Sequence, residues 1–418
     1  MAVEQEKPVI LQIIPQLETG GAELSTLEIV QALRQAGARA LVVTEGGRMA
    51  GEVERLGGEL VLMPMASKNP FEMLRNKSRL ERLVSEYNVA LLHARSRAPA
   101  WSALLVASKL KIPFVTTYHG AYGEAEPFKR LYNSVMARGD RVIANSQFTA
   151  DLVRARHAVD EKKLRVIYRG VDIERFSREA VSSKQRQALR DQWGVGREDQ
   201  IFLHPARLTR WKGQGVVIRA MKELLTERPD NRAVLIIAGD HQGREDYLAE
   251  LQRLIVENAL QERIRLVGHC ADMAVAYTLA HVTLIASIEP EAFGRTSAEA
   301  QAMGCPVIAT NIGAPPETVR ATPFVLPEER TGWLVPPDDA QALATIMQEL
   351  LELTEEQKRK IRQNTIENVR HFFSDGLMKL QTLAVYDELL ETDFARQFEK
   401  STGLADLSAQ PLGSYPGS

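Results

Sequence analysis

The architecture is clearest in residues 9–35, which open with Val9-Ile-Leu-Gln-Ile-Ile-Pro15, pass through Gly20 and Gly21, and continue as Ala22–Gln35. The first segment is almost continuously apolar and rich in isoleucine, which is typical of a strand buried on both faces of a parallel sheet. The last segment carries apolar residues at helical spacing, at Leu24, Leu27, Val30 and Leu33. A strand, a glycine turn and a helix in this order predict the first βα unit of a doubly wound α/β fold.

Short apolar runs and amphipathic segments repeat this βα unit along the chain. In the first half the predicted strands are 40–44, 60–64, 89–93, 113–119, 141–145 and 164–167, and the predicted helices are 49–56 and 74–87. In the second half the predicted strands are 201–205, 233–238, 264–267, 282–285 and 306–310, and the predicted helices are 183–193, 216–226, 246–258, 273–280, 297–303 and 340–353. The alternation predicts two parallel sheets with helices on both faces.

The length of 418 residues indicates more than one domain, because a single hydrophobic core stops growing at about 250–300 residues. We expect a first domain over 1–171, a hinge near Gly170 and a second domain over 172–370. After Thr354 the chain is predicted to be helical to about residue 391. A tail over 400–418, rich in Gly, Ser and Pro, is expected to be disordered. Ligands of doubly wound sheets bind beyond the carboxyl ends of the strands.

The composition, with 44% hydrophobic and 25% charged residues, is that of an ordinary globular protein and excludes a disordered, collagen-like or coiled-coil chain. Two cysteines are too few for a disulfide framework and fit a reducing compartment. No apolar run approaches the roughly 18–20 residues of a membrane-spanning helix. The N-terminus places two glutamates before its only lysine, the wrong order for a signal peptide. We therefore expect a soluble cytoplasmic protein.

The formal net charge of −2 conceals an uneven distribution. Residues 1–170 hold 24 basic and 18 acidic side chains, and residues 171–418 hold 28 and 36. The excess is concentrated in residues 68–170, with 19 basic and 9 acidic side chains. Such a segment fits an anionic partner and equally fits a solvated basic face.

Two loops that follow predicted strands carry residues suited to an anion. The pair Gly20–Gly21 lets the backbone approach a ligand at the start of a helix, although a plain tight turn is the commoner reason for such a pair. The loop Arg207-Leu-Thr-Arg-Trp-Lys-Gly213 places cations at the mouth of a parallel sheet, where they suit a diphosphate or form a solvated basic loop. Neither loop has the Gly-x-Gly-x-x-Gly pattern of a dinucleotide-binding oxidoreductase, which disfavours that activity.

A third loop, over residues 289–309, holds Glu291 and, after seven intervening residues, Glu299. We expect Glu291 in the loop after strand 282–285 and Glu299 in the first turn of the following helix. Carboxylates only accept hydrogen bonds, which suits sugar hydroxyls, and the backbone of 293–296 at the helix start supplies N–H groups for an anion. The pattern favours a hexose at one glutamate, a ribose at the other and phosphates between them. A glutamate that merely complements the helix dipole is the alternative.

Together these motifs resemble the signature of retaining glycosyltransferases with the GT-B fold, in glycosyltransferase family 4. The matching motifs are Gly20–Gly21, His119–Gly120, Gly170-Val-Asp172 with Phe176, Arg-x4-Lys-Gly ending at Gly213, Glu-x7-Glu ending at Glu299, and the segments 310–317 and 331–336. They cover about residues 8–390. The resemblance implies two Rossmann-like domains facing across a cleft, the first for the acceptor and the second for the nucleotide-sugar donor. It also implies a C-terminal helix over 371–392 that packs back on the first domain.

The resemblance implies a role for each matching residue. Arg207 and Lys212 would bind the donor diphosphate and stabilise the leaving nucleotide. Glu299 would bind the ribose and Glu291 a hydroxyl of the transferred sugar. The implied catalytic residues are His119, Arg207, Lys212 and Glu291, and the implied donor-binding residues are Gly20, Gly21, Phe293, Gly294, Arg295, Thr296 and Glu299. Arg295 stands where the family often has an aliphatic residue, and a third phosphate contact or donor selection would follow from it.

The implied activity is transfer of a hexose from a nucleoside-diphosphate sugar to an acceptor hydroxyl with retention of anomeric configuration. The reaction would occur on one face of the sugar, and a double displacement with Glu291 as nucleophile is the alternative. No cofactor and no metal are expected, because Arg207, Lys212 and helix N-termini neutralise the phosphates and the sequence contains no Asp-x-Asp. The alternative functions are a GT-B nucleotide-sugar epimerase and a non-catalytic nucleotide-sugar-binding protein.

Basic and apolar residues interleave in two segments of the first domain. In 68–83 they are Lys68, Arg75, Lys77, Arg79 and Arg82 with Phe71, Met73, Leu74, Leu80 and Leu83, and in 128–141 they are Lys129, Arg130, Arg138 and Arg141 with Phe128, Leu131, Tyr132, Val135 and Met136. Basic amphipathic helices bind anionic membranes, and inward packing of the apolar residues is the alternative. We expect a peripheral enzyme at the inner face of the cytoplasmic membrane, acting on a lipid-linked or saccharide acceptor in lipopolysaccharide, exopolysaccharide or glycolipid biosynthesis. No nucleic-acid partner is expected.

Overall fold

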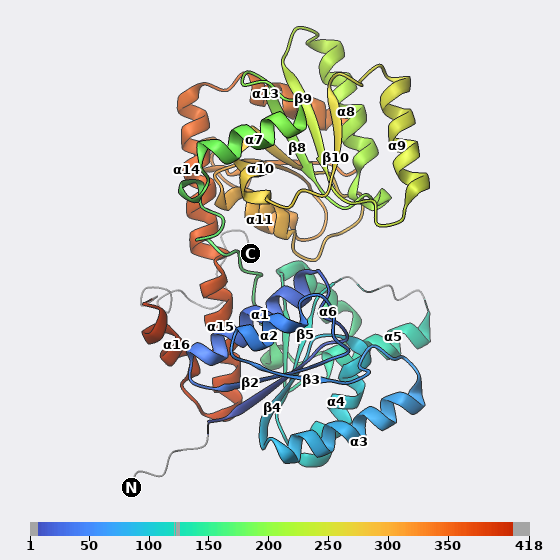
Figure 1. Cartoon of the computed structure of the whole chain (residues 1–418), viewed down its shortest axis with the longest axis vertical. Coiled ribbons are helices and arrows are strands. Elements are labelled where there is room, and N and C mark those ends of the chain that lie inside the picture. The colour runs from blue at the N-terminus through green and yellow to red at the C-terminus, as the bar shows by residue number, and fades with distance from the viewer. Residues whose placement is uncertain (1–6, 121, 123–125, 404–418) are drawn as a thin grey trace. The chain divides into compact units, whose positions relative to one another are not determined.

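A computed structural model describes residues 7–120, 122 and 126–403 (Figure 1). The chain forms two compact units: unit 1 runs to Gly170 and resumes at Asp375, and unit 2 is Val171–Ser374. The sequence analysis placed these domain boundaries between residues 171 and 172 and between residues 370 and 371. In the structure the second boundary comes later, because the helix that ends at Phe372 packs against the rest of unit 2 along its length. Gly170 packs directly on the returning chain, since a Cβ at this position would lie 2.2 Å from the Cα atom of Asp375.

Unit 1 contains a seven-stranded parallel sheet with the order β3-β2-β1-β4-β5-β6-β7. Its strands are β1 Val9–Ile13, β2 Arg39–Thr44, β3 Glu59–Leu62, β4 Val89–Ala94, β5 Phe114–Tyr118, β6 Arg141–Ala144 and β7 Leu164–Val166. Its helices are α1 Gly21–Gln35, α2 Ala50–Arg55, α3 Pro70–Glu86, α4 Arg97–Leu110, α5 Pro127–Asn133, α6 Gln147–Arg156, α15 Asp375–Leu390 and α16 Phe394–Thr402. The predicted α/β fold is confirmed for this half of the chain.

Two hydrophobic cores cover the two faces of this sheet. Leu11 and Ile13 of β1 pack with α3, α4 and α6, whereas Ile10, on the opposite face, packs with α1, α2, α15 and α16. This alternation explains the almost continuous apolar run of β1, because both of its faces are covered. Helix α15 is also fastened by a buried hydrogen bond, 2.7 Å long, between Nδ1 of His93 and the hydroxyl group of Tyr386.

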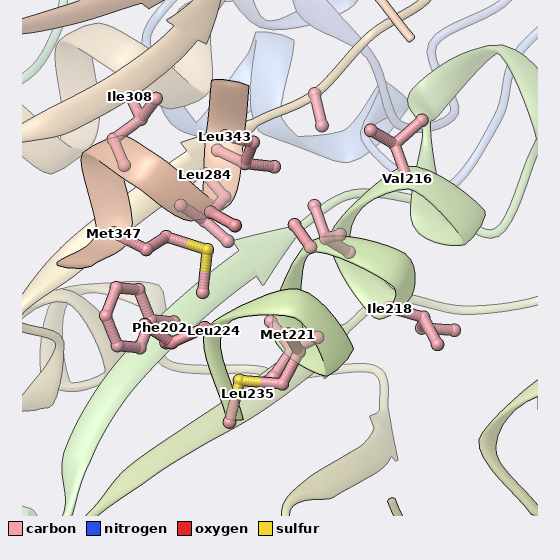
Figure 2. Close-up of a cluster of buried hydrophobic side chains, with 14 of the residues drawn as sticks. Phe202, Val216, Ile218, Met221, Leu224, Leu235, Leu284, Ile308, Leu343 and Met347 are labelled. Atoms are coloured by element: carbon pink, nitrogen blue, oxygen red, sulfur yellow. The ribbon is translucent and has the colours of Figure 1, made fainter. Parts of the chain in front are cut away.

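Unit 2 contains a six-stranded parallel sheet with the order β10-β9-β8-β11-β12-β13. Its strands are β8 Gln200–Pro205, β9 Ala233–Ala238, β10 Ile264–Gly268, β11 Val282–Ile285, β12 Val307–Thr310 and β13 Gly332–Val335. Its helices are α7 Ser183–Trp193, α8 Gln214–Glu227, α9 Glu245–Glu257, α10 Met273–Leu279, α11 Arg295–Ala302, α12 Pro315–Thr318, α13 Ala340–Leu351 and α14 Glu355–Phe372. Figure 2 shows its core, in which Phe202 and Leu284 of the sheet pack with Met221 of α8 and Met347 of α13.

Some elements differ from the sequence-based expectation. Helix α3 begins at Pro70 rather than at residue 74, because Asn69 caps it by accepting a hydrogen bond from the Phe71 amide. Helices α4, α5, α6, α12 and α16 and strand β13 were not predicted. Of the tail expected to be disordered, 400–402 belong to α16, and its remainder from 404 onward lies outside the described residues. Among the helices that the structure describes, none is long and apolar enough to cross a membrane.

Candidate active site

Strand β8 of unit 2 leads into the loop that carries Arg207 and Lys212, and the loop reaches α8 through Gly213. Gly213 has a φ of +76°, and a Cβ at this position would lie 1.8 Å from the carbonyl oxygen of Ala286, just beyond β11. Only glycine tolerates both the positive φ and this close approach. Gly213 therefore holds the Lys212 loop directly against the end of β11, from which the Glu291 loop starts.

Lys212 and Glu291, predicted separately from two motifs, form an ion pair. Nζ of Lys212 lies 2.7 Å from Oε1 of Glu291, and the two side chains are 17% and 10% exposed. The hydroxyl group of Ser287 donates a hydrogen bond to the same carboxylate oxygen. The Glu291 backbone is held as well, because its carbonyl oxygen accepts a hydrogen bond of 2.9 Å from the amide of Ala314. The carboxylate is thus oriented by groups from three loops.

Arg207 differs from Lys212 in being exposed. Its carbonyl oxygen accepts a hydrogen bond of 2.9 Å from the buried side chain of Gln214, which fixes the backbone at the start of the loop. Within the described ranges, no hydrogen bond or ion pair engages its guanidinium group. Of the three cations in this loop, Lys212 is paired with Glu291 and Arg210 with Glu250, whereas Arg207 is open to an incoming anion.

His204, on β8, is a buried neighbour of the pair that the sequence analysis missed. Its Nδ1 atom lies 2.8 Å from the carbonyl oxygen of Leu284, so Nδ1 carries the proton and donates. Burial and the charge of Lys212 lower the pKa of His204 to about 4, although the hydrogen bond to Leu284 and the charge of Glu291 oppose the shift. The imidazole is therefore neutral at physiological pH and adds no positive charge beside Lys212.

Glu299 lies on α11, which starts at Arg295 because Gly294 caps it with a φ of +84°. Glu299 is therefore in the second turn, not in the first turn as the sequence analysis expected. Its Oε2 atom accepts a hydrogen bond of 3.3 Å from the hydroxyl group of the buried Tyr277. Burial, together with the negative charge of Glu299, raises the pKa of Tyr277 well above its ordinary value, so this hydroxyl remains a donor.

The residues between Glu291 and Glu299 include one side chain that anchors the loop and several polar groups at the start of α11. The ring of Phe293 is only 4% exposed and packs edge-on against Phe373 at a centroid distance of 5.8 Å, so it anchors the loop. No side chain caps the start of α11, which leaves the first N–H groups, at Arg295 and the half-buried Thr296, directed out of the helix. Nε of Arg295 lies 3.6 Å from Oε1 of Glu299.

In unit 1, His119 follows β5 and contacts a buried arginine that the sequence analysis did not select. Nδ1 of His119 accepts a hydrogen bond from the guanidinium group of Arg169, which also donates to the hydroxyl group of Ser25 on α1. Burial and the Arg169 charge lower the pKa of His119 well below its ordinary value. Because arginine only donates, the proton of the neutral imidazole lies on Nε2. This Nε2–H group is buried and has no partner among the described residues.

The start of α1 is open as well. Gly20 is extended and provides no side-chain cap, and a Cβ placed at Gly21 would meet no atom within 4 Å. The fold itself therefore does not require glycine at position 21. Because Ser25 of the same helix contacts Arg169, the start of α1 and His119 lie at the same end of the unit 1 sheet.

Gly21→Ala tests whether a ligand requires this glycine. If a ligand contacts the backbone here, kcat/KM falls about tenfold or more, because overpacking a site costs ~1–3 kcal/mol. The free energy of unfolding stays the same or rises by up to ~1 kcal/mol, because alanine favours the helix. Steady-state kinetics and denaturant unfolding measure the two effects. Gly51→Ala in α2, where a Cβ also meets nothing within 4 Å, is the matched control, and an equal loss of activity there would contradict the ligand contact.

The described residues contain no group of three or more His, Cys, Asp or Glu side chains placed to hold a metal ion. What the two units offer is an ion pair, an exposed guanidinium group, two uncapped helix starts, an oriented carboxylate and an imidazole N–H donor. Cations and helix N-termini suit phosphate oxygens, and oriented carboxylates suit hydroxyl groups.

Comparisons with known proteins agree over nearly the whole chain. The profile of Glycosyltransferase Family 4 matches residues 19–175, and that of Glycosyl transferases group 1 matches residues 185–371. A crystal structure of a glycosyltransferase from Rickettsia africae is 33% identical and superimposes with a TM-score of 0.84, covering 93% of this chain and 100% of that chain.

Two further proteins carry names that describe what they bind or act on. The D-inositol 3-phosphate glycosyltransferase of Jonesia denitrificans is 26% identical over 361 residues, which are 79% of this chain and 82% of that protein. The structure of Anabaena HepE in complex with UDP-glucose is 25% identical, with a TM-score of 0.75, and covers 91% of this chain and 100% of that chain.

Proposed function

The chain belongs to the glycosyltransferases of family 4 and group 1, with the GT-B fold, and on this premise we propose that it transfers a hexose from a nucleoside-diphosphate sugar to an acceptor hydroxyl with retention. The observation that carries the proposal is the Lys212–Glu291 pair, because it brings a phosphate-binding cation and a hydroxyl-binding carboxylate together in one cluster. The relative that binds UDP-glucose supports a nucleotide-sugar donor.

Each group of unit 2 has a role in this proposal. Arg207 and Lys212 bind the diphosphate, together with the N–H groups at the start of α11. Glu299, held by Tyr277, accepts hydrogen bonds from the ribose hydroxyls. Glu291 accepts one from the transferred sugar. In unit 1, the Nε2–H group of His119 donates to a sugar oxygen, and the open start of α1 receives phosphate or acceptor.

The mechanism that fits these groups takes place on one face of the sugar. The acceptor oxygen bonds to C1 of the hexose as the bond from C1 to the phosphate oxygen breaks, and the hydroxyl proton passes to the departing phosphate. Negative charge grows on the diphosphate, where fixed cations and helix N–H groups stabilise the transition state more than the ground state. Glu291 is a poor nucleophile for a double displacement, because Lys212 and Ser287 both engage its carboxylate.

We propose an acceptor in lipopolysaccharide, exopolysaccharide or glycolipid biosynthesis, used at the inner face of the cytoplasmic membrane. The 19 basic against 9 acidic side chains in residues 68–170 support an acceptor with anionic groups. The name of the Jonesia relative, which acts on an inositol phosphate, also points to a hydroxyl-rich anionic acceptor.

Turnover in the presence of EDTA tests the proposal. The purified protein is incubated with UDP-, GDP- and ADP-sugars, with and without EDTA, and nucleotide release is measured. We expect slow hydrolysis of one donor at the same rate in EDTA, because Arg207, Lys212 and the helix N-termini replace a metal. NMR of the released or transferred hexose should show the donor's anomeric configuration.

The other possible results of this assay would each contradict one part of the proposal or favour an alternative function. Loss of activity in EDTA that Mg²⁺ restores would contradict metal independence. An inverted product would contradict retention. Binding of donors without any release would favour the non-catalytic alternative, and release of an epimerised sugar would favour an epimerase.

A further inference from the structure

Helix α3 has an exposed face that is apolar at its start and basic further along. Phe71, Arg75, Ser78 and Arg82 share this face by their spacing, Leu74 lies beside it, and all five are exposed. The exposed fraction of Phe71 reaches 78%. The opposite face holds Leu80, Leu83 and Val84 and is buried in the unit 1 core. Inward packing therefore accounts for Leu80, Leu83 and Val84, but it does not account for Phe71 and Leu74.

Helix α5 shows the same combination. Phe128 is 84% exposed, and Leu131, one turn later, is also exposed. Lys129 and Arg130 lie between them and are exposed. Isolated exposed apolar residues are normal on soluble proteins. Two helices that each combine an exposed Phe and Leu with basic side chains are instead typical of surfaces that lie in a membrane interface.

Helix α4 places these two surfaces next to each other. The hydroxyl group of Ser102 donates a hydrogen bond of 2.9 Å to the carbonyl oxygen of Met73 in α3. The indole N–H group of the preceding residue, Trp101, donates one of 3.1 Å to the carbonyl oxygen of Tyr132 in α5. The first turns of α3 and the end of α5 therefore flank the same part of α4. Figure 1 shows α3, α4 and α5 grouped together in unit 1.

Half of the cations around these side chains already have a partner: Arg75 pairs with Glu72, Lys129 pairs with Glu126, and Arg130 donates a hydrogen bond to the carbonyl oxygen of Arg156. These contacts are exposed, and exposed ion pairs are weak enough to exchange for lipid phosphates. Arg138 lies over the Trp101 ring, with its guanidinium carbon 5.1 Å from the ring centroid. In the part of the chain that the structure describes, no ion pair engages Lys68, Arg82 or Arg138. The surrounding segment has the largest positive excess of the protein, with 19 basic against 9 acidic side chains in residues 68–170.

We propose that α3 and α5 form a docking surface for anionic lipid membranes. Its members are Phe71, Leu74, Phe128 and Leu131, which insert among the lipid headgroups, and Lys68, Arg75, Arg82, Lys129, Arg130 and Arg138, which contact the lipid phosphates. Each basic side chain near such a surface strengthens binding about fivefold, and each inserted Phe about tenfold. The inference deepens the proposed function and rests on it for the lipid-linked acceptor, but the binding itself requires no turnover.

Flotation of the full chain with lipid vesicles tests the surface. One set of vesicles is phosphatidylcholine, and the other contains equal parts of phosphatidylcholine and phosphatidylglycerol. We expect the protein to float with the anionic vesicles only and to be released by salt. Phe71→Ser and Phe128→Ser should each weaken binding about tenfold, and Arg75→Glu with Arg82→Glu should reduce it further.

Phe324→Ser in unit 2 is the matched control, because Phe324 is 74% exposed and lies on the other unit. It should float as the unaltered chain does. Equal flotation with neutral vesicles, or equal loss in Phe324→Ser, would overturn the proposal. The proposal would also be overturned if the protein did not float, sedimented as a dimer, and became a monomer in the Phe71→Ser variant. The surface would then bind a second copy of the chain. Donor hydrolysis without lipid should be unchanged in all these variants, so that failure of the surface and failure of the proposed function are distinguishable.

Discussion

Replacing Lys212 with methionine is expected to lower kcat about 10²–10³-fold, which is the typical cost of removing one preorganised group that stabilises transition-state charge. Lys212 is placed by Gly213 and fixed by Glu291 at 2.7 Å, so its charge is in position before the diphosphate departs. Kinetics with saturating donor, together with thermal unfolding, would separate the lost charge from lost stability.

A double-mutant cycle distinguishes action on phosphate from action through Glu291. If Lys212 stabilises the leaving diphosphate, Lys212→Met lowers kcat strongly even in a Glu291→Gln background. If Lys212 only orients Glu291, the double variant is no slower than Glu291→Gln alone, and the phosphate role is wrong. Arg210→Met is the matched control in the same loop, since Arg210 pairs with the exposed Glu250. It should leave kcat unchanged.

Replacing Glu299 with glutamine is expected to raise the Kd of the preferred nucleoside diphosphate about 10–100-fold, with a smaller effect on kcat. Hydrogen bonds to a charged group contribute ~1.5–3 kcal/mol, and glutamine keeps the shape while losing one acceptor and the charge. Calorimetric titration with UDP, GDP and ADP in the absence of acceptor measures this effect without turnover.

Tyr277→Phe is the companion variant, because it removes only the hydroxyl group that orients the Glu299 carboxylate. Its effect on nucleotide affinity should have the same direction and be several-fold smaller. Unchanged nucleotide affinity in Glu299→Gln, combined with loss of turnover, would contradict the ribose-binding role and indicate a chemical role for this carboxylate.

The elements that sequence reasoning missed have weak signals for physical reasons. The buried side of α4 is formed largely by alanines, such as Ala100, Ala103 and Ala107, so its hydrophobic periodicity has little contrast. Strand β13 begins with Gly332, which lowers strand propensity. The same glycine permits the pairing, since a Cβ there would lie 2.0 Å from the carbonyl oxygen of Val307. A signal for α6 was present in Ser146, which caps the helix by accepting a hydrogen bond from the Thr149 amide.

The local sequence pattern was sufficient to predict the architecture and to select most of the candidate residues that lie at the strand ends. Strand β1 is apolar except at the buried Gln12, because both of its faces are covered, and side-chain periodicity reports such burial directly. The positions of Arg207, Lys212, Glu291 and Glu299 could also be read from the sequence, because each lies a fixed number of residues from a strand or a helix start.

Contacts between residues distant in sequence were decided only by the tertiary structure. The pairing of Lys212 with Glu291, the tautomer of His119 set by Arg169, and the holding of Glu299 by Tyr277 all join different loops or helices. Likewise, the sequence showed that α3 and α5 carry both apolar and basic residues, but packing decided which of them face solvent. Periodicity describes one element at a time, whereas pairing, protonation and exposure depend on what the fold brings beside it.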